Sequence, residues 1–181
     1  MSTNYGTVPE PKTVRMERLL PGPIERVWSY LTDAEKRSTW FAGGPMELHV
    51  GGKALLQFQH ENLSSEPIPE EYVAHCGPGS PPSVGHVTRC APPHLLAYTW
   101  WEDQGDTSEI TFELEDRDGQ VLLVLTHRNL EDRKEMLGVS GGWHIHLDLL
   151  EDVLRGNPRR PFWKRMGDLK KEYDQRIPAD A

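Results

Sequence analysis

The chain has 181 residues, of which 36% are hydrophobic and 27% are charged, a balance typical of one globular domain. Its formal net charge of -8 disfavours nucleic-acid binding and attraction to anionic membranes, which both usually need a basic surface. No apolar run reaches the roughly 18 residues that span a bilayer, and residues 1–12 lack the apolar core of a signal peptide. We therefore expect a cytoplasmic protein in which Cys76 and Cys90 are free thiols.

The first structured segment predicts a strand followed by two short helices. Side chains alternate in polarity from Val14 to Leu20, as in a half-buried strand, and Pro21-Gly22-Pro23 ends that strand. The next apolar residues follow helical spacing: Ile24, Val27, Trp28 and Leu31. Thr32 and Glu35 have the spacing of a capping box, which predicts that a second helix begins there and carries Trp40 at its end.

Six further strands are expected, in antiparallel order. The first two form a hairpin around Gly51-Gly52 and cover Met46–Val50 and Lys53–His60. Residues 61–83 are rich in proline and glycine and predict a long surface loop. The remaining four strands are expected at Val84–Cys90, Leu95–Trp101, Ser108–Glu115 and Val121–His127.

The helical period returns near the end of the chain. Apolar residues from Trp143 to Leu154 predict a long helix that stops at Gly156-Asn157-Pro158. A tail helix begins near Pro161 and carries an apolar stripe formed by Phe162, Met166, Leu169 and Tyr173. We expect this tail to pack on the outer face of the sheet near Trp101, or else on a second subunit.

Several motifs occur in a recognisable order: Glu17–Thr32 with Val27-Trp28, Trp40-Phe41, Gly51-Gly52, Gly85-His86-Val87, Pro92–Trp100, Leu125–His127 and Gly142-Trp143. Their order and spacing resemble the START-like, helix-grip (SRPBCC) superfamily. Within it, the chain is most similar to the AHSA-type family, named after the C-terminal domain of the activator of the 90-kDa heat-shock chaperone ATPase, as a stand-alone bacterial member.

The resemblance implies an α+β helix-grip fold. An antiparallel sheet of six to seven strands would curve around the long C-terminal helix, with two short helices after the first strand and a cavity between sheet and helix. The implied organisation is a flexible N-terminus at 1–11, the domain at 12–156 and the tail helix at 157–181. The family name does not give the function, because the chaperone activator also needs a separate N-terminal domain, and a fold alone does not fix activity.

The sequence contains no recognisable catalytic or metal-binding motif. His144 and His146 point about 200° apart on a helix, so they cannot share one ion, and we expect them to face solvent. His144 and Asp148 share one helix face, but two ligands do not make a zinc site. We expect no metal, no cofactor and no enzymatic constellation.

The candidate site is the expected cavity. Strand parity places several polar side chains on its concave side, and a mainly apolar cavity with a few polar groups is typical of a small-molecule site. Its predicted lining is Phe58, His60, His86, Tyr98, Trp100, Phe112, His127, Trp143 and Leu147. The hypothesis is a monomer or homodimer that binds a hydrophobic small molecule. The alternatives are a cyclase- or hydrolase-type enzyme that uses the His and Tyr groups as acid and base, and an interaction module of a stress or chaperone pathway.

Overall fold

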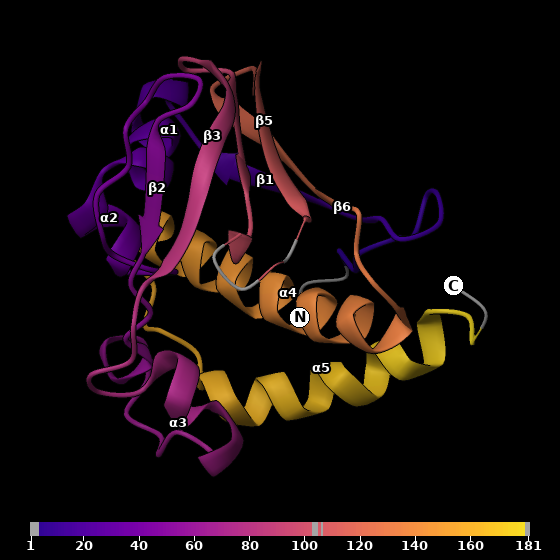
Figure 1. Cartoon of the computed structure of the whole chain (residues 1–181). Coiled ribbons are helices and arrows are strands. Elements are labelled where there is room, and N and C mark those ends of the chain that lie inside the picture. The colour runs from indigo at the N-terminus through magenta and orange to yellow at the C-terminus, as the bar shows by residue number, and fades with distance from the viewer. Residues whose placement is uncertain (1–3, 103–104, 106, 180–181) are drawn as a thin grey trace.

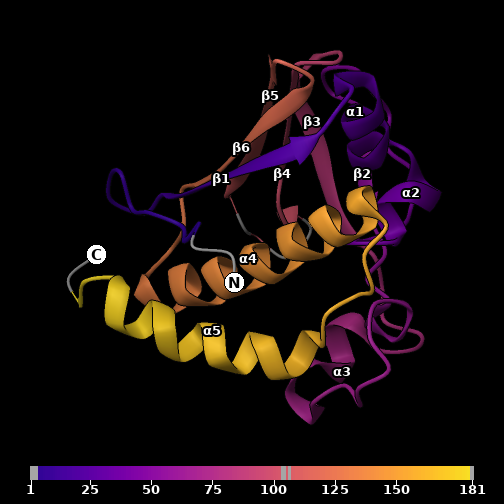
Figure 2. The same ribbon diagram turned by 180° about the vertical axis from the view of Figure 1, so that it is seen from behind.

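An antiparallel sheet covers the long helix α4 (Arg133–Arg155), and a second helix, α5 (Phe162–Arg176), lies under α4 on the side away from the sheet (Figure 1). The computed structural model describes residues 4–102, 105 and 107–179. Within this part of the chain, six strands follow the spatial order β1-β6-β5-β4-β3-β2. The view from behind shows the same three layers (Figure 2). The predicted α+β helix-grip fold is confirmed.

The strands are β1 (Val14–Pro21), β2 (Lys53–Leu56), β3 (Ser83–Ala91), β4 (Leu95–Thr99), β5 (Glu109–Arg117) and β6 (Gln120–Arg128). In β1, Val14, Met16 and Leu20 are buried while Glu17 and Leu19 are exposed, as the alternation predicts. The strand pairs along its whole length with β6, from Val14 opposite His127 to Pro21 opposite Gln120. The sheet therefore presents one apolar face to α4.

Two short helices follow β1, namely α1 (Ile24–Thr32) and α2 (Ala34–Ser38). The predicted cap at Thr32 is wrong. Asp33 is the N-cap of α2 and accepts a hydrogen bond from the backbone N–H of Lys36, 2.9 Å away. Thr32 instead donates to the carbonyl of Trp28 within α1. The adjacent aspartate occupies the cap, because its carboxylate accepts hydrogen bonds well at a helix N-terminus.

The predicted first hairpin is only partly formed. Residues 46–50 make no strand, and the segment before β2 pairs through isolated bridges between Gly43 and Gln57 and between Met46 and Ala54. Gly44 has a φ of +92°, and Pro45 lacks a backbone N–H, so a regular ladder cannot continue there. The sheet consequently has six strands, the lower of the two expected numbers.

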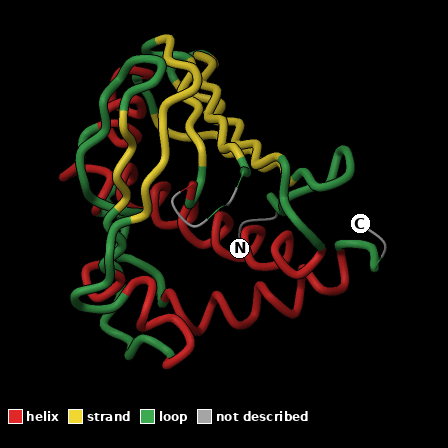
Figure 3. Tube along the Cα trace, in the orientation of Figure 1, coloured by secondary structure: helices red, strands yellow, loops and turns green. Residues whose placement is uncertain are grey.

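The prediction of a surface loop over residues 61–83 is also wrong in part. The segment contains the helix α3 (Glu70–Cys76), which starts directly after Pro69 (Figure 3). The ring of Tyr72 stacks on Trp163 of α5, with centroids 5.0 Å apart. Glu66 accepts hydrogen bonds from the backbone N–H groups of Trp163 and Lys164 and so caps α5. The segment is thus held in place by contacts with α5, which lies far from it in the sequence.

Helix α4 starts ten residues before Trp143 and is covered on two sides. Its N-cap is Asp132, and its C-cap is Gly156, whose φ of +70° suits the predicted stop. His144 and His146 are buried, so the expectation that they face solvent is wrong. The reason is α5, which covers the face of α4 that a single helix on a sheet would leave in water.

The tail helix docks on its own chain, against α4. Its stripe residues Phe162, Met166, Leu169 and Tyr173 are buried there, and not on the outer face of the sheet near Trp101. Tyr5–Thr7 fall in the segment expected to be flexible, yet the Tyr5 hydroxyl donates to Glu172 and Thr7 forms a bridge with Arg15. Among the described residues, no helix combines the length and apolarity needed to cross a membrane.

Candidate functional site

Aromatic rings fill the space between the sheet and the middle of α4. Trp143 lies 5.8 Å from Phe112 and 5.7 Å from Trp100, measured between ring centroids, and Tyr98 lies 6.2 Å from Phe112. Phe58 and Leu147 are buried in the same core. These six residues were predicted to line a cavity, and in the structure most of them contact one another instead.

His127 is buried in this core and has a fixed tautomer. The indole N–H of Trp143 donates to its Nδ1 over 3.1 Å, so the proton of the neutral ring sits on Nε2, which faces the Ser108 hydroxyl at 2.9 Å. Burial lowers the pKa of His127 to about 3. A general base for Ser108 would need a free lone pair on Nε2. His127 therefore donates to Ser108 and does not activate it.

His60 lies at the other side of α4, beside α5. Its ring is 5.2 Å from that of His146 and 4.8 Å from that of Phe162. Burial, and secondly the neighbouring His146, lower the pKa of His60 to about 3. Burial also lowers the pKa of His146 to about 4, although its ring nitrogen donates to the carbonyl of Trp40. Both rings are thus neutral parts of the packing.

His86 does not face the concave side, and this prediction is wrong. Its neighbours Gly85 and Val87 are buried, whereas its own side chain is 42% exposed and lies 2.7 Å from the Glu102 carboxylate. The backbone N–H of His86 also donates to the Thr99 hydroxyl. In β3 the buried positions are Ser83, Gly85 and Val87, so the predicted alternation is shifted by one residue. A shift by one residue moves each side chain of a strand to the other face of the sheet.

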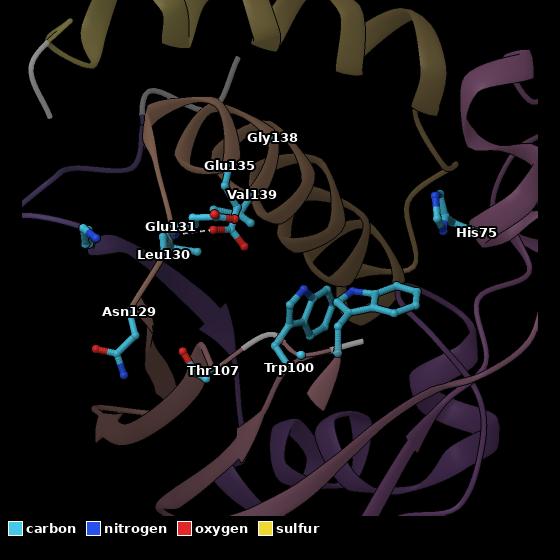
Figure 4. Close-up of a pocket in the computed structure, with 12 residues that line it drawn as sticks. His75, Trp100, Thr107, Asn129, Leu130, Glu131, Glu135, Gly138 and Val139 are labelled. Carbon is cyan, nitrogen blue, oxygen red and sulfur yellow. Dashed lines mark hydrogen bonds between the residues drawn. The ribbon is translucent and has the colours of Figure 1, made fainter. Parts of the chain in front are cut away.

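We call the sheet together with α4, which it covers, the grip. A pocket of about 950 Å³ opens at one end of the grip, and we call it the end pocket. Its walls come from the start of α4, from α3 and from the two segments that precede β5 and follow β6 (Figure 4). Glu135, Gly138 and Val139 line it from α4, Trp100 lies opposite them, and His75 reaches in from α3. Of the nine predicted cavity residues, Trp100 alone belongs to this lining.

Trp100 and Trp101 form a corner in the end pocket. Their rings are 6.0 Å apart and almost perpendicular, at 87°. Each ring is supported by a buried ring of the core: Trp100 stacks on Phe41 at 6.0 Å, and Trp101 stacks on Phe58 at 6.0 Å. Because the supporting rings fix both indoles, the corner is formed before any ligand arrives.

Backbone strain is concentrated at the same place. Four non-glycine residues in the described part of the chain have a positive φ, and three of them line the end pocket: Lys12 at 59°, Trp101 at 45° and Asn129 at 61°. The fourth, Asp118, lies in the turn between β5 and β6. Such conformations cost energy and gather at ligand-binding and active sites.

Sequence reasoning missed most of the end pocket. Its described lining comes from four separate parts of the chain: Lys12, His75, the residues Trp100, Trp101, Gly105 and Thr107, and residues between Asn129 and Val139. Two local signals were available. One is the pair Trp100-Trp101 at the end of a strand, and the other is Asn129, a residue type that tolerates positive φ, just before a helix.

Apart from the end pocket, a cluster of polar side chains joins β1, α4 and α5, and we call it the clasp. Arg18 donates to Asp148 Oδ1 at 3.1 Å, and Arg160 lies 2.9 Å from Asp148 Oδ2. The Tyr173 hydroxyl lies 2.8 Å from His144 Nδ1, whose other nitrogen is 3.6 Å from Asp148. Burial raises the pKa of Asp148, and the two arginines oppose this. Because Arg18, His144 and Asp148 are almost fully buried, the clasp holds elements together.

Neither the end pocket nor the clasp has the composition of a metal centre. Within the part of the chain that the structure describes, no group of three or more His, Cys, Asp or Glu side chains could hold an ion. Cys76 is buried, and its burial raises the pKa of the thiol to about 11, so the reactive thiolate is disfavoured.

Solved structures share this fold. A protein of Bordetella parapertussis is 42% identical, with a TM-score of 0.79 over 96% of this chain and 91% of its own. CalU16 of Micromonospora echinospora is 21% identical, with a TM-score of 0.70 over 96% of this chain and 98% of its own. The Aha1 dimer of Colwellia psychrerythraea is 17% identical, with a TM-score of 0.58 over 78% of this chain and 97% of its own. The last two likenesses concern the fold alone.

The sequence comparison identifies the family. No curated protein matches the chain. Residues 21–155 match the family model described as Activator of Hsp90 ATPase homolog 1-like protein, a match that begins at the end of β1 and stops at the last residue of α4. Since this region is most of the chain, and since the expected helix-grip fold is present, the chain belongs to the family of Activator of Hsp90 ATPase homolog 1-like proteins.

Proposed function

We propose that the protein binds a small, mainly apolar molecule with a flat ring in the end pocket. The observation that carries this proposal is the corner of two indoles, each supported by a core ring, inside a pocket of about 950 Å³. Pockets for small molecules are of this size and combine aromatic walls with a few polar groups. The strained backbone at Lys12, Trp101 and Asn129 also supports the end pocket as the binding site.

In this proposal the ligand binds at the end of the grip and not in its middle, where the sequence predicts the cavity. The middle holds Trp143, which is 3% exposed and surrounded by other rings. At the end of the grip, α4 carries Gly138, where an added Cβ would meet nothing within 4 Å. The absence of a side chain at Gly138 therefore contributes to the open space.

A neutral fluorescent probe, N-phenyl-1-naphthylamine, tests this proposal. Gly138→Phe places a ring in the end pocket, and we expect it to weaken probe binding by at least about tenfold, or 1.4 kcal/mol. Gly167→Phe is the matched control, because Gly167 is also an exposed helical glycine with nothing within 4 Å of an added Cβ, but lies on α5. Equal probe affinity in the two variants contradicts the proposal, provided that circular dichroism shows both to be folded.

Two alternatives receive less support. An enzyme that uses the cavity histidines needs a base, and the tautomer of His127 leaves none toward Ser108. The chaperone hypothesis rests on the family description, so we do not propose it for this chain. A homodimer stays a prediction beside the monomer: the Colwellia relative is described as a dimer, and sedimentation of the purified protein measures the state directly.

A further inference from the structure

The end pocket has an acidic side. Glu131 and Glu135 lie together at the start of α4, across the pocket from Trp100 (Figure 4). Among the lining residues that the structure describes, Lys12 is the one lysine or arginine. With two carboxylates and one ammonium, the described lining residues carry a formal charge of -1 in a protein whose own net charge is -8. The local field therefore favours a positive guest over a negative one.

The N-terminus of α4 does not reverse this preference. The exposed N–H groups of a helix start attract anions, but here the chain supplies its own. The Asp132 carboxylate accepts from the N–H of Glu135 at 2.8 Å, and the Glu135 carboxylate accepts from the N–H of Glu131. An anion that approached this helix end would meet carboxylates already in place.

The indole corner also favours a cation. The face of a tryptophan ring is negative, and it attracts ammonium groups better than other aromatic side chains do. A flat ring that stacks in the corner of Trp100 and Trp101 can direct a substituent toward the carboxylates on the other side. The two carboxylates and the indole corner thus both favour a flat molecule with a positive charge.

Building on the binding function proposed above, we infer that the end pocket selects flat aromatic molecules that carry a positive charge, such as aryl-alkyl ammonium ions, over neutral or anionic molecules of the same shape. Glu131 and Glu135 are then specificity-determining residues, and the two indoles supply the contact area.

Three naphthalene probes separate shape from charge: 2-naphthylmethylamine, 2-naphthylmethanol and 2-naphthoic acid. They share one ring system and are respectively cationic, neutral and anionic at pH 7. Isothermal titration calorimetry with the full chain should show the amine binding at least about tenfold more tightly than the acid, as expected for two unit charges a few ångström from the guest. The advantage of the amine should shrink as salt is added.

Single charge changes locate the effect. Glu131→Gln should weaken binding of the amine about three- to tenfold and leave the alcohol within about twofold. Lys12→Gln should strengthen binding of the amine and weaken that of the acid. Glu113→Gln is the control, because Glu113 is an exposed carboxylate in the middle of β5 and does not line the end pocket. It should change none of the three affinities.

The outcomes distinguish the two proposals. If none of the probes binds, the binding function itself fails. If the alcohol and the acid bind as well as the amine, the end pocket binds aromatic rings and the inference about charge is overturned. A preference for the amine that Glu131→Gln and Glu113→Gln reduce equally also overturns it, since the selection would then come from the net charge of the protein.

Discussion

The middle of the grip and its end are built from the same kinds of residue and behave differently. In the middle, Trp143 is 3% exposed, and its N–H is bound by His127. At the end, Trp100 and Trp101 are only partly buried and line open space. The difference lies on α4, which carries Trp143 and Leu147 toward the sheet but Gly138 at the end pocket. One helix thus closes the grip in one place and leaves it open in another.

Removing the ring in the middle should have the largest effect. Trp143→Ala leaves a cavity among packed rings and deprives His127 of its hydrogen bond, so we expect a loss of about 3–5 kcal/mol in the free energy of unfolding. Trp101→Ala, at the open end, should lose less than about 2 kcal/mol, because less of its surface is buried. Urea unfolding measures both. Equal losses would show that the two regions are not different in packing.

Acid should weaken the packed region next. The pKa of His60 is about 3 in the folded chain and about 6.5 when unfolded. As the pH falls below about 6.5, the unfolded chain takes up a proton that folded His60 refuses, so the free energy of unfolding decreases until the pH reaches about 3. Between pH 7 and pH 5, His60 alone should contribute a loss of about 2 kcal/mol.

The variant His60→Phe isolates this contribution. Phenylalanine suits a site surrounded by Phe58, Phe162 and Trp163, and it cannot be protonated. Its stability should therefore fall by about 2 kcal/mol less between pH 7 and pH 5 than that of the parent chain. The control is His49→Gln, at an exposed histidine, and it should keep the parent slope. If His60→Phe also keeps the parent slope, His60 is not held neutral by the packing.

The smallest effect is expected from backbone strain at the end pocket. Lys12 has a φ of 59°, which glycine adopts without a steric penalty. Lys12→Gly should raise the free energy of unfolding by about 0.5–1 kcal/mol. In contrast, Lys171→Gly, at an exposed position within α5, should lower it by about 1 kcal/mol. A loss at both positions would mean that the end pocket stores no strain.

The sequence predicts well whatever depends on neighbouring residues. The alternation in β1 and the helical spacing in α1 are local patterns, and both elements are confirmed. The start of α4 was missed because Gly138, Gly141 and Gly142 look like helix breakers. At Gly141, an added Cβ would come within 3.3 Å of Met166, so this glycine permits the close approach of α5.

The candidate site was harder to predict because its residues meet only in the folded chain. The aromatic residues of the middle are buried, but a periodic pattern does not tell whether their rings leave space between them. The burial of His144 depends on Tyr173, and the end pocket joins segments as distant as Lys12 and Glu135. Such contacts follow from register and helix docking, which no local pattern contains.

The hydrogen bond from the backbone N–H of Gly6 to the Tyr173 hydroxyl, 2.7 Å long, has a consequence for biosynthesis. Its two partners are separated by 167 residues, nearly the whole chain. A nascent chain grows from its N-terminus, so Gly6 leaves the ribosome 167 residues before its partner Tyr173. Tyr5 likewise waits for Glu172. The N-terminal segment therefore reaches its final place only after α5 has left the ribosome, so the first strand must fold before the segment that precedes it is fixed.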